Sequence, residues 1–260
     1  MDEPIAKILP ASGTCTTMSV DQKIEVMNAA PGELKGLDCP VCNNKGYVAF
    51  EKDGVFTLKE CICMARRASL RRMKKSGLSG LLSLYTFSAY ETPEPWQKTA
   101  KETAKRFVQE WAGQWFVITG APGTGKTHLC TAIAAALMRQ SKDVQYMLWR
   151  DEAPRLKALV NERDGYEPLM DEFKYADVLY IDDFFKGDVT AADRHLAFEL
   201  INARYIQPRK VTLISSEHSI EELLNIDEAI GSRIYERSKG FRIKTPKQNW
   251  RLKGADNDRT

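Results

Sequence analysis

A stretch of eight residues, 120–127, has the composition of a loop that binds phosphate. It reads Gly-Ala-Pro-Gly-Thr-Gly-Lys-Thr and directly follows the apolar run 115–119. Such a loop turns backbone N–H groups inward around an anion, and residues without a Cβ reach the conformations that this turn requires. We expect Lys126 to contact the β- and γ-phosphates of a nucleoside triphosphate and the hydroxyl of Thr127 to bind Mg²⁺. The predicted nucleotide-binding residues are Gly120, Pro122, Gly123, Thr124, Gly125, Lys126, Thr127 and His128.

Two adjacent acids close an apolar run further along the chain. Residues 178–183 read Val-Leu-Tyr-Ile-Asp-Asp, which is typical of a buried strand that ends in two carboxylates. We expect Asp182 to bind the same Mg²⁺ as Thr127, and Asp183 to orient and polarise the water that attacks the γ-phosphate. The alternative is a strand followed by a solvated acidic turn. Together with the phosphate loop, the acid pair predicts an ATPase.

Further candidates lie in the last third of the chain. After Ile214 the chain reads Ser215-Ser216-Glu217-His218, where a polar group at the end of a strand could sense the γ-phosphate. Arg233 and Arg237 are four residues apart and therefore share one face of a predicted helix. Either guanidinium could reach the ATP of a neighbouring subunit as an arginine finger and stabilise the charge on the transferred phosphoryl group. An ordinary surface helix would show the same spacing.

Four cysteines fall in one short window as two closely spaced pairs, Cys39, Cys42, Cys61 and Cys63. This pattern predicts a small zinc ribbon, because four thiolates complete a tetrahedral site. A segment this short cannot bury enough apolar surface to fold without such a metal. The Asp53-Gly54 pair predicts the turn of a hairpin that joins the two ligand pairs. Unrelated reduced thiols are the alternative, since the second pair is C-x-C and not the commoner C-x-x-C.

The elements that must position these residues follow from the apolar periodicity. Strands are predicted at 115–119, 144–148, 178–183 and 211–215, and helices at 127–140, 152–160, 191–206 and 219–224. Strands that alternate with helices indicate an α/β fold with a parallel, doubly wound sheet and the nucleotide at the carboxyl ends of its strands. The expected organisation is a poorly defined segment 1–37 with a short helix at 20–28, a zinc-ribbon module 38–64, a basic helical linker 65–112 and an ATPase domain 113–260.

Composition excludes disordered and fibrous proteins, since 43% of the 260 residues are hydrophobic. The net charge of +3 conceals a block structure. Residues 1–60 hold 6 basic and 9 acidic side chains, residues 61–112 hold 10 and 4, residues 113–236 hold 14 and 20, and residues 237–260 hold 8 and 2. Two basic stretches that flank an acidic core suit contact with a polyanion or an acidic partner, although solvated surfaces would give the same pattern.

No apolar run is long enough to cross a membrane, and the N-terminus lacks the basic start of a signal peptide. We therefore expect a soluble protein without a membrane partner.

The order of these motifs resembles the AAA+ ATPases of the initiator and helicase-loader group, and more narrowly the DnaC/DnaI-type helicase loaders. The motifs that carry the resemblance are residues 120–127, 181–183, 214–216 and 232–234. The cysteine ribbon resembles the zinc-binding N-terminal module of such loaders, and the segment 75–90 resembles their linker. The chain ends too soon after Ser216 for the helical lid that many AAA+ proteins carry, so we expect a core without this lid.

The resemblance implies a cytoplasmic protein of a bacterial or phage-infected cell that uses ATP, Mg²⁺ and Zn²⁺. It implies binding of a hexameric replicative helicase (DnaB/DnaC-type) through the N-terminal region, and self-association into an ATP-dependent oligomer or spiral. It further implies loading of the helicase onto single-stranded DNA during replication initiation. DNA contacts are expected in the basic C-terminal block and near Trp149 and Arg150. Glu217 departs from the family pattern, in which Asn often follows the two serines. The resemblance therefore assigns the sensing of the γ-phosphate to Ser216, and the departure predicts weak intrinsic turnover.

Two other interpretations stay open. An IstB-type ATPase helper of a transposase shares the core without a lid but acts on duplex DNA and a recombinase; that branch usually begins with a helical segment and not with a cysteine ribbon. A zinc-stabilised adaptor would bind ATP as a structural switch and hardly hydrolyse it. The intact Asp182-Asp183 pair argues for turnover, whereas Glu217 favours the adaptor.

Overall fold

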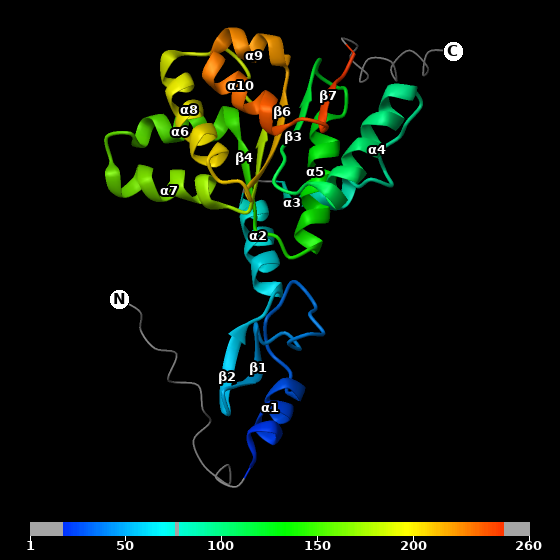
Figure 1. Ribbon diagram of the computed structural model, residues 1–260, viewed down its shortest axis with the longest axis vertical. Helices are drawn as coiled ribbons and strands as arrows, with labels where there is room; N and C mark the ends of the chain where they lie inside the picture. Colours follow the sequence, from blue (N-terminus) through cyan, green and yellow to red (C-terminus); the bar gives the residue numbers. More distant parts are fainter. Residues whose placement is uncertain (1–17, 76–77, 247–260) are drawn as a thin grey trace. The chain divides into compact units, whose positions relative to one another are not determined.

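The computed structural model describes residues 18–75 and 78–246, and the chain divides into two units. The first unit extends to Met64, and the second begins at Ala65. Figure 1 colours both units along the sequence. Along the described residues, no helix combines the length and the apolar character that crossing a membrane requires.

The first unit consists of a helix and a hairpin, α1 (Val20–Ala29), β1 (Tyr47–Lys52) and β2 (Val55–Glu60). The strands pair antiparallel around Asp53 and Gly54, whose φ angles of 52° and 78° suit a two-residue hairpin turn. The side chain of Asn28 ties α1 to β1, because its amide group both donates to and accepts from the backbone of Ala49 at 2.8 Å. The helix predicted at 20–28 and the predicted hairpin are therefore confirmed.

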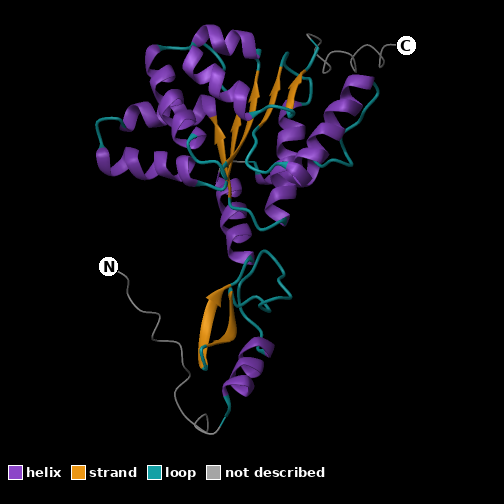
Figure 2. Cartoon of the chain, viewed as in Figure 1, coloured by secondary structure: helices purple, strands orange, loops and turns teal. Residues whose placement is uncertain are grey.

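The second unit is built on five strands, β3 (Phe116–Thr119), β4 (Val144–Leu148), β5 (Val178–Asp182), β6 (Val211–Ser216) and β7 (Arg242–Lys244). Their order in the sheet is β4-β5-β6-β3-β7, and every neighbouring pair is parallel. All residues of β3, β5 and β6 are buried, as expected for a parallel sheet that is covered on both faces. Figure 2 shows this layering of strands and helices. The parallel, doubly wound α/β fold predicted from the sequence is confirmed.

Nine helices complete the described part of this unit, with α2 beginning at the boundary: α2 (Cys63–Lys75), α3 (Ser79–Leu84), α4 (Pro95–Glu110), α5 (Lys126–Arg139), α6 (Trp149–Leu159), α7 (Arg163–Tyr175), α8 (Ala191–Tyr205), α9 (Ile220–Ile226) and α10 (Glu228–Arg237). The helices α4 and α5 pack on one face of the sheet, where Phe107 contacts Phe116 and Phe241. The helices α6 to α10 cover the other face (Figure 1). The sheet thus has a hydrophobic core on each side.

The helix α2 is anchored to the edge strand β4. Ser69 Oγ accepts a hydrogen bond from the N–H of Val144 at 2.9 Å, and Arg72 forms an ion pair with Asp143. Residues from 65 onward thus belong to the same compact unit as the five-stranded sheet. The four-part domain division made from the sequence stays a prediction, as does the lack of a helical lid, because residues 247–260 lie outside the described part.

Candidate functional site

The phosphate loop connects β3 to α5. Its glycines have left-handed φ angles of 130° at Gly120, 75° at Gly123 and 83° at Gly125. A Cβ on Gly125 would lie 2.8 Å from the ring of Tyr90, so this position also requires a glycine for space. The loop ends at the N-terminus of α5, where the helix dipole favours an anion. Local geometry and helix direction therefore both suit a bound phosphate.

A cavity of about 220 Å³ opens at this loop, lined by Tyr85, Pro122, Gly123, Gly125, Lys126, Thr127, His128, Asp183, Lys186 and Glu217. Six of the eight predicted nucleotide-binding residues are among them. The other two, Gly120 and Thr124, do not line the cavity. The hydroxyl of Thr124 is 3.0 Å from that of Thr245, and a Cβ on Gly120 would come within 2.2 Å of the same Thr245 oxygen. These two residues therefore shape the loop from the side opposite the cavity.

The ammonium of Lys126 is held close to the loop. Its Nζ donates to the carbonyl oxygens of Gly120 and Ala121, each at 2.8 Å. Burial lowers the pKa of Lys126, while the charges of Glu217 and Asp183 act in the opposite direction. The side chain is thus fixed beside the cavity before any phosphate arrives.

Asp182 ends β5 and is only 4% exposed. Its carboxylate accepts hydrogen bonds from Thr127 Oγ1 at 3.2 Å, from the hydroxyl of Tyr146 at 3.2 Å, and from Ser215 Oγ. Burial raises the pKa of Asp182, and the hydrogen bond from Ser215 opposes that rise. A hydroxyl and a carboxylate oxygen are the hard ligands that Mg²⁺ prefers. The Thr127 and Asp182 pair, predicted from the sequence to bind magnesium, therefore has suitable donors in contact.

Asp183 lines the cavity together with Lys186 and Glu217, two residues that were not predicted to lie in the pocket. Lys186 Nζ lies 3.1 Å from Asp183 Oδ2 and 2.9 Å from Glu217 Oε1. Glu217 stood out in the sequence only as a departure from a family pattern, and Lys186 gave no signal. The two ion pairs add a basic group to the acidic wall of the site.

The two serines at the end of β6 have different partners. The hydroxyl of Ser216 donates to the carbonyl of Phe184 at 2.8 Å and accepts from the N–H of His218 at 3.1 Å. Ser216 is fully buried and does not line the cavity, which disagrees with the sensing role predicted for it. Successive strand residues point to opposite faces, so the hydroxyl that reaches Asp182 is that of Ser215.

Aromatic residues close the cavity beside α5. The ring of Tyr85 stacks on that of His128 with centroids 4.7 Å apart, and His128 Nε2 lies 2.8 Å from the carbonyl oxygen of Thr86. Tyr85 belongs to the segment that the sequence assigned to a linker. An aromatic residue in that segment does not by itself indicate that it lines the pocket.

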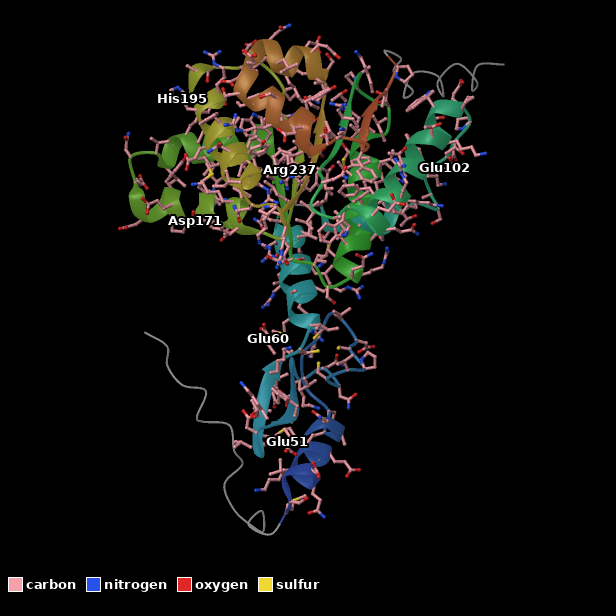
Figure 3. All side chains as sticks on the ribbon, in the orientation of Figure 1. Glu51, Glu60, Glu102, Asp171, His195 and Arg237 are labelled. Carbon is pink, nitrogen blue, oxygen red and sulfur yellow. The ribbon has the colours of Figure 1, made fainter. Side chains whose placement is uncertain are left out.

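The two candidate arginine fingers on α10 have unequal surroundings. Arg233 lies against the rings of Phe198 and Tyr205, and its Nε donates to Asn202. Arg237, labelled in Figure 3 at the end of α10, lies over the ring of Trp115. The guanidinium of Arg237 also donates to backbone carbonyls of its own unit, those of Gly113, Tyr205, Gln207, Pro208 and Lys210. This geometry favours a structural role for Arg237 and leaves Arg233 as the stronger candidate for a finger.

The two residues predicted to lie near DNA also differ in exposure. Trp149 is 3% exposed and packs against Phe184 and Phe185, so its ring is not available to stack on a base. Arg150 is exposed. The basic block that begins at Arg237 continues into residues 247–260, outside the described part.

The four clustered cysteines of the first unit are all buried, and their sulfur atoms lie within 4.8 Å of one another: Cys39, Cys42, Cys61 and Cys63. The Sγ atoms of Cys39 and Cys61 are 3.8 Å apart, and those of Cys42 and Cys63 are 3.7 Å apart. Zinc–sulfur bonds of about 2.3 Å in a tetrahedron place neighbouring sulfurs at about 3.8 Å, so the cluster fits Zn²⁺.

The cysteine thiols also differ in acidity. Burial acts to raise the pKa of Cys42, but the N–H of Gly46 and the neighbouring thiols lower it to about 6. Burial raises the pKa of Cys61 to about 12. A divalent cation would stabilise all four groups as thiolates, which is the state that zinc binds.

Comparison with known proteins gives a family match over most of the chain. Residues 58–244 match the model of the family described as IstB-like ATP binding protein. The chain is 32% identical over 228 residues to the Phage-like element PBSX protein XkdC of Bacillus subtilis (strain 168), a match that covers 82% of this chain and 84% of that protein. It is 25% identical over 170 residues to the Replicative helicase loader DnaC of Escherichia coli (strain K12), covering 64% and 68% of the two chains.

Solved structures share the fold. The crystal structure of the DnaC helicase loader has a TM-score of 0.54 and 22% identity, covering 64% of this chain and 99% of that chain. The AMPPCP-bound DnaA from Aquifex aeolicus has a TM-score of 0.54 and 20% identity, covering 67% of this chain and 54% of that chain. The sequence matches agree with the predicted resemblance, and the chain belongs to the IstB/DnaC family of AAA+ ATP-binding proteins.

Proposed function

We propose that this protein is an ATPase that loads a hexameric replicative helicase onto single-stranded DNA during replication initiation. The observation that carries the proposal is the match over 170 residues to a replicative helicase loader. The geometry of the nucleotide site supports it, because Lys126, Thr127 and Asp182 converge beside one cavity. A loader needs such a site if its binding to the helicase is to depend on ATP.

The proposed ATP site works through positioning and charge. The backbone N–H groups of residues 120–127 and the ammonium of Lys126 bind the phosphates, and Thr127 and Asp182 hold Mg²⁺. When bound, Mg²⁺ offsets the negative charge that develops on the β- and γ-phosphate oxygens. Asp183 lies at the cavity wall, where its carboxylate can accept a hydrogen bond from water and align it with the γ-phosphate.

Assembly would complete the site. In an ATP-dependent oligomer or spiral, Arg233 reaches the γ-phosphate that a neighbouring subunit binds and stabilises its charge during transfer. The half-buried guanidinium lies against Phe198, which is 39% exposed, so this arginine is close to the surface of α8 and α10. ATP hydrolysis at one subunit thereby depends on contact with the next.

The first unit is the proposed contact for the helicase. With Zn²⁺ bound by the four cysteines, the segments between the ligands expose apolar side chains, Val41 at 57% and Ile62 at 63%. These exposed apolar side chains are available to a protein partner. Single-stranded DNA would meet basic groups of the second unit, including Arg150 and the C-terminal block, through its phosphates.

Specific observations favour two other functions. The description of the matching family supports an IstB-like ATPase helper of a transposase, which would act with a recombinase on duplex DNA. The ion pair between Lys186 and Asp183 supports an adaptor with little hydrolysis, because it neutralises the acid proposed to orient water. The partner that the protein selects and its rate of ATP turnover discriminate among the three.

The test is to mix the full chain with the cognate replicative helicase and to measure the mass of the product with ATP, with ADP and without nucleotide. We expect a complex that forms with ATP and is lost in a Lys126→Ala variant. Binding to a recombinase and duplex DNA but not to the helicase would instead support the transposase helper. No helicase complex under any nucleotide condition would rule out the loader.

A further inference from the structure

One lysine joins two acids on the wall of the nucleotide cavity. Lys186 Nζ lies 3.1 Å from Asp183 Oδ2 and 2.9 Å from Glu217 Oε1. All three side chains line the same cavity as Lys126 and Thr127 of the phosphate loop. The ammonium of Lys186 is therefore a second positive charge beside the position that phosphates would occupy.

The backbone holds this lysine in place through a tight turn after β5. Asp183 and Phe185 both adopt left-handed φ angles, 54° and 58°, and the N–H of Lys186 donates to the carbonyl of Asp183 at 3.0 Å. The rings of Phe184 and Phe185 are buried and stacked on each other, and this packing holds the turn in place. Left-handed conformations in residues other than glycine persist only where the surrounding structure enforces them, and they concentrate at functional sites.

Charge balance at the wall explains why a lysine is needed there. Glu217 places a carboxylate beside the cavity, and a bare carboxylate would repel the terminal phosphate of ATP. Burial acts to lower the pKa of Lys186, but its hydrogen bonds with Glu217 and Asp183 raise that pKa above its ordinary value. The lysine is therefore charged at neutral pH and neutralises the acids on either side of it.

We propose that Lys186, held by Glu217, is the residue that recognises the γ-phosphate of ATP in this protein. The inference rests on the proposed ATP site. When ATP binds, the ammonium of Lys186 leaves the carboxylate of Asp183 and pairs with a γ-phosphate oxygen. Its ion pair with Glu217 remains. The exchange frees Asp183 to bind water, so the acid becomes available only when a γ-phosphate is present. The Lys186 and Glu217 pair thus replaces the polar sensor predicted at Ser216, whose hydroxyl is bonded elsewhere.

The experiment measures the dissociation constants of the ATP analogue AMPPCP and of ADP by calorimetry in excess Mg²⁺. ADP lacks the γ-phosphate, so Lys186→Met should weaken AMPPCP binding by about tenfold or more and change ADP binding by less than about twofold. The matched control is Lys210→Met, which removes a paired, half-buried lysine that contacts Asp177 before β5. We expect the control to bind both nucleotides as the wild type does.

A double variant tests the role of Glu217. Adding Glu217→Gln to Lys186→Met removes the bare carboxylate, so AMPPCP should bind more tightly than to the single variant. A double variant that binds no more tightly would overturn the pairing assigned to Glu217. Lys186→Gln repeats the test with a polar side chain if the methionine variant does not fold.

Two results separate this inference from the proposed function. If the wild type binds AMPPCP and ADP, and Lys186→Met weakens both equally or neither, the γ-phosphate role of Lys186 is wrong while the ATP site stands. If the wild type binds neither nucleotide, the proposed ATP site itself is overturned.

Discussion

At the scale of single residues, the nucleotide site is organised before a ligand binds. Lys126 donates to two loop carbonyls, and Asp182 accepts from three side chains. Groups that are already oriented need no reorganisation when charge appears beside them. The bonds of Lys126 lie within the phosphate loop, whereas those of Asp182 join β5 to the start of α5, to β4 and to β6, so this part of the site depends on the register of neighbouring strands.

Gly120 gives a direct test of the loop geometry. Its φ angle is 130°, and a Cβ there would lie 2.2 Å from Thr245 Oγ1. Gly120→Ala should weaken AMPPCP binding by about fivefold to a hundredfold, because the strain of about 1–3 kcal/mol must be relieved by moving the loop. Calorimetry measures the affinity.

The control for Gly120 is Gly54→Ala in the hairpin turn of the first unit. Gly54 also has a left-handed φ angle, 78°, but a Cβ there meets no atom within 4 Å. This variant should keep the wild-type affinity for the nucleotide. Wild-type affinity in Gly120→Ala as well would mean that the contact with Thr245 does not set the loop.

At the scale of elements, local patterns predicted most of the sheet and the phosphate loop. The strands β3, β4, β5 and β6 are short, mainly apolar segments, so the sequence identifies them without knowledge of their neighbours. The strand β7 was not predicted, because its three residues lie in a basic stretch and become a strand only by pairing with β3. The helix α7 was also missed, since Gly165 and Pro168 interrupt its pattern while Met170 and Phe173 pack in the core.

The parts of the site that escaped prediction depend on contacts between distant segments. Tyr85 precedes the phosphate loop by more than thirty residues and reaches the cavity only because its segment packs against α5. The choice between Ser215 and Ser216 depends on which face of β6 each side chain takes. Lys186 acquires its role from Glu217, which directly follows the end of β6. Spacing within one motif does not contain this information.

The cysteine cluster is the element-scale prediction for metal. We expect about one zinc ion per chain, because four thiolates complete a tetrahedral site. Cys42→Ser should release the metal and unfold the hairpin unit, whose sheet has only two strands. Metal analysis by mass spectrometry and circular dichroism check the two effects.

Cys130→Ala is the control for the metal, since it removes a buried thiol from the other unit. This variant should retain the wild-type zinc content. A purified protein without zinc, or a Cys42→Ser variant that keeps it, would contradict the ribbon.

At the scale of the whole molecule, the charge blocks suit a protein that joins several partners. The near-neutral total is a cancellation between an acidic core and two basic flanks. The acidic block 113–236 contains the phosphate loop, and the basic blocks on either side of it are the candidates in the sequence for contact with a polyanion. A net charge of +3 is therefore no argument against DNA binding.

Self-association yields a prediction for α10. Arg233→Ala should lower ATP turnover in the assembled state by about a thousandfold or more, as expected for loss of an arginine finger, with AMPPCP affinity of the isolated chain unchanged. Arg237→Ala should instead lower the free energy of unfolding, because it leaves several backbone carbonyls without their donor. Turnover assays and urea unfolding distinguish the two. Normal turnover by Arg233→Ala in the assembly would remove the finger.

The most direct measurement of the central claim is the amount of helicase loaded onto closed circular single-stranded DNA. A closed hexamer cannot thread onto a circle without ring opening, so retention on the circle reports loading and not sliding from an end. We predict that helicase stays on the circle with the wild-type protein and ATP, and that Lys126→Ala or omission of ATP abolishes this retention. Equal retention of helicase with and without the protein would contradict the account.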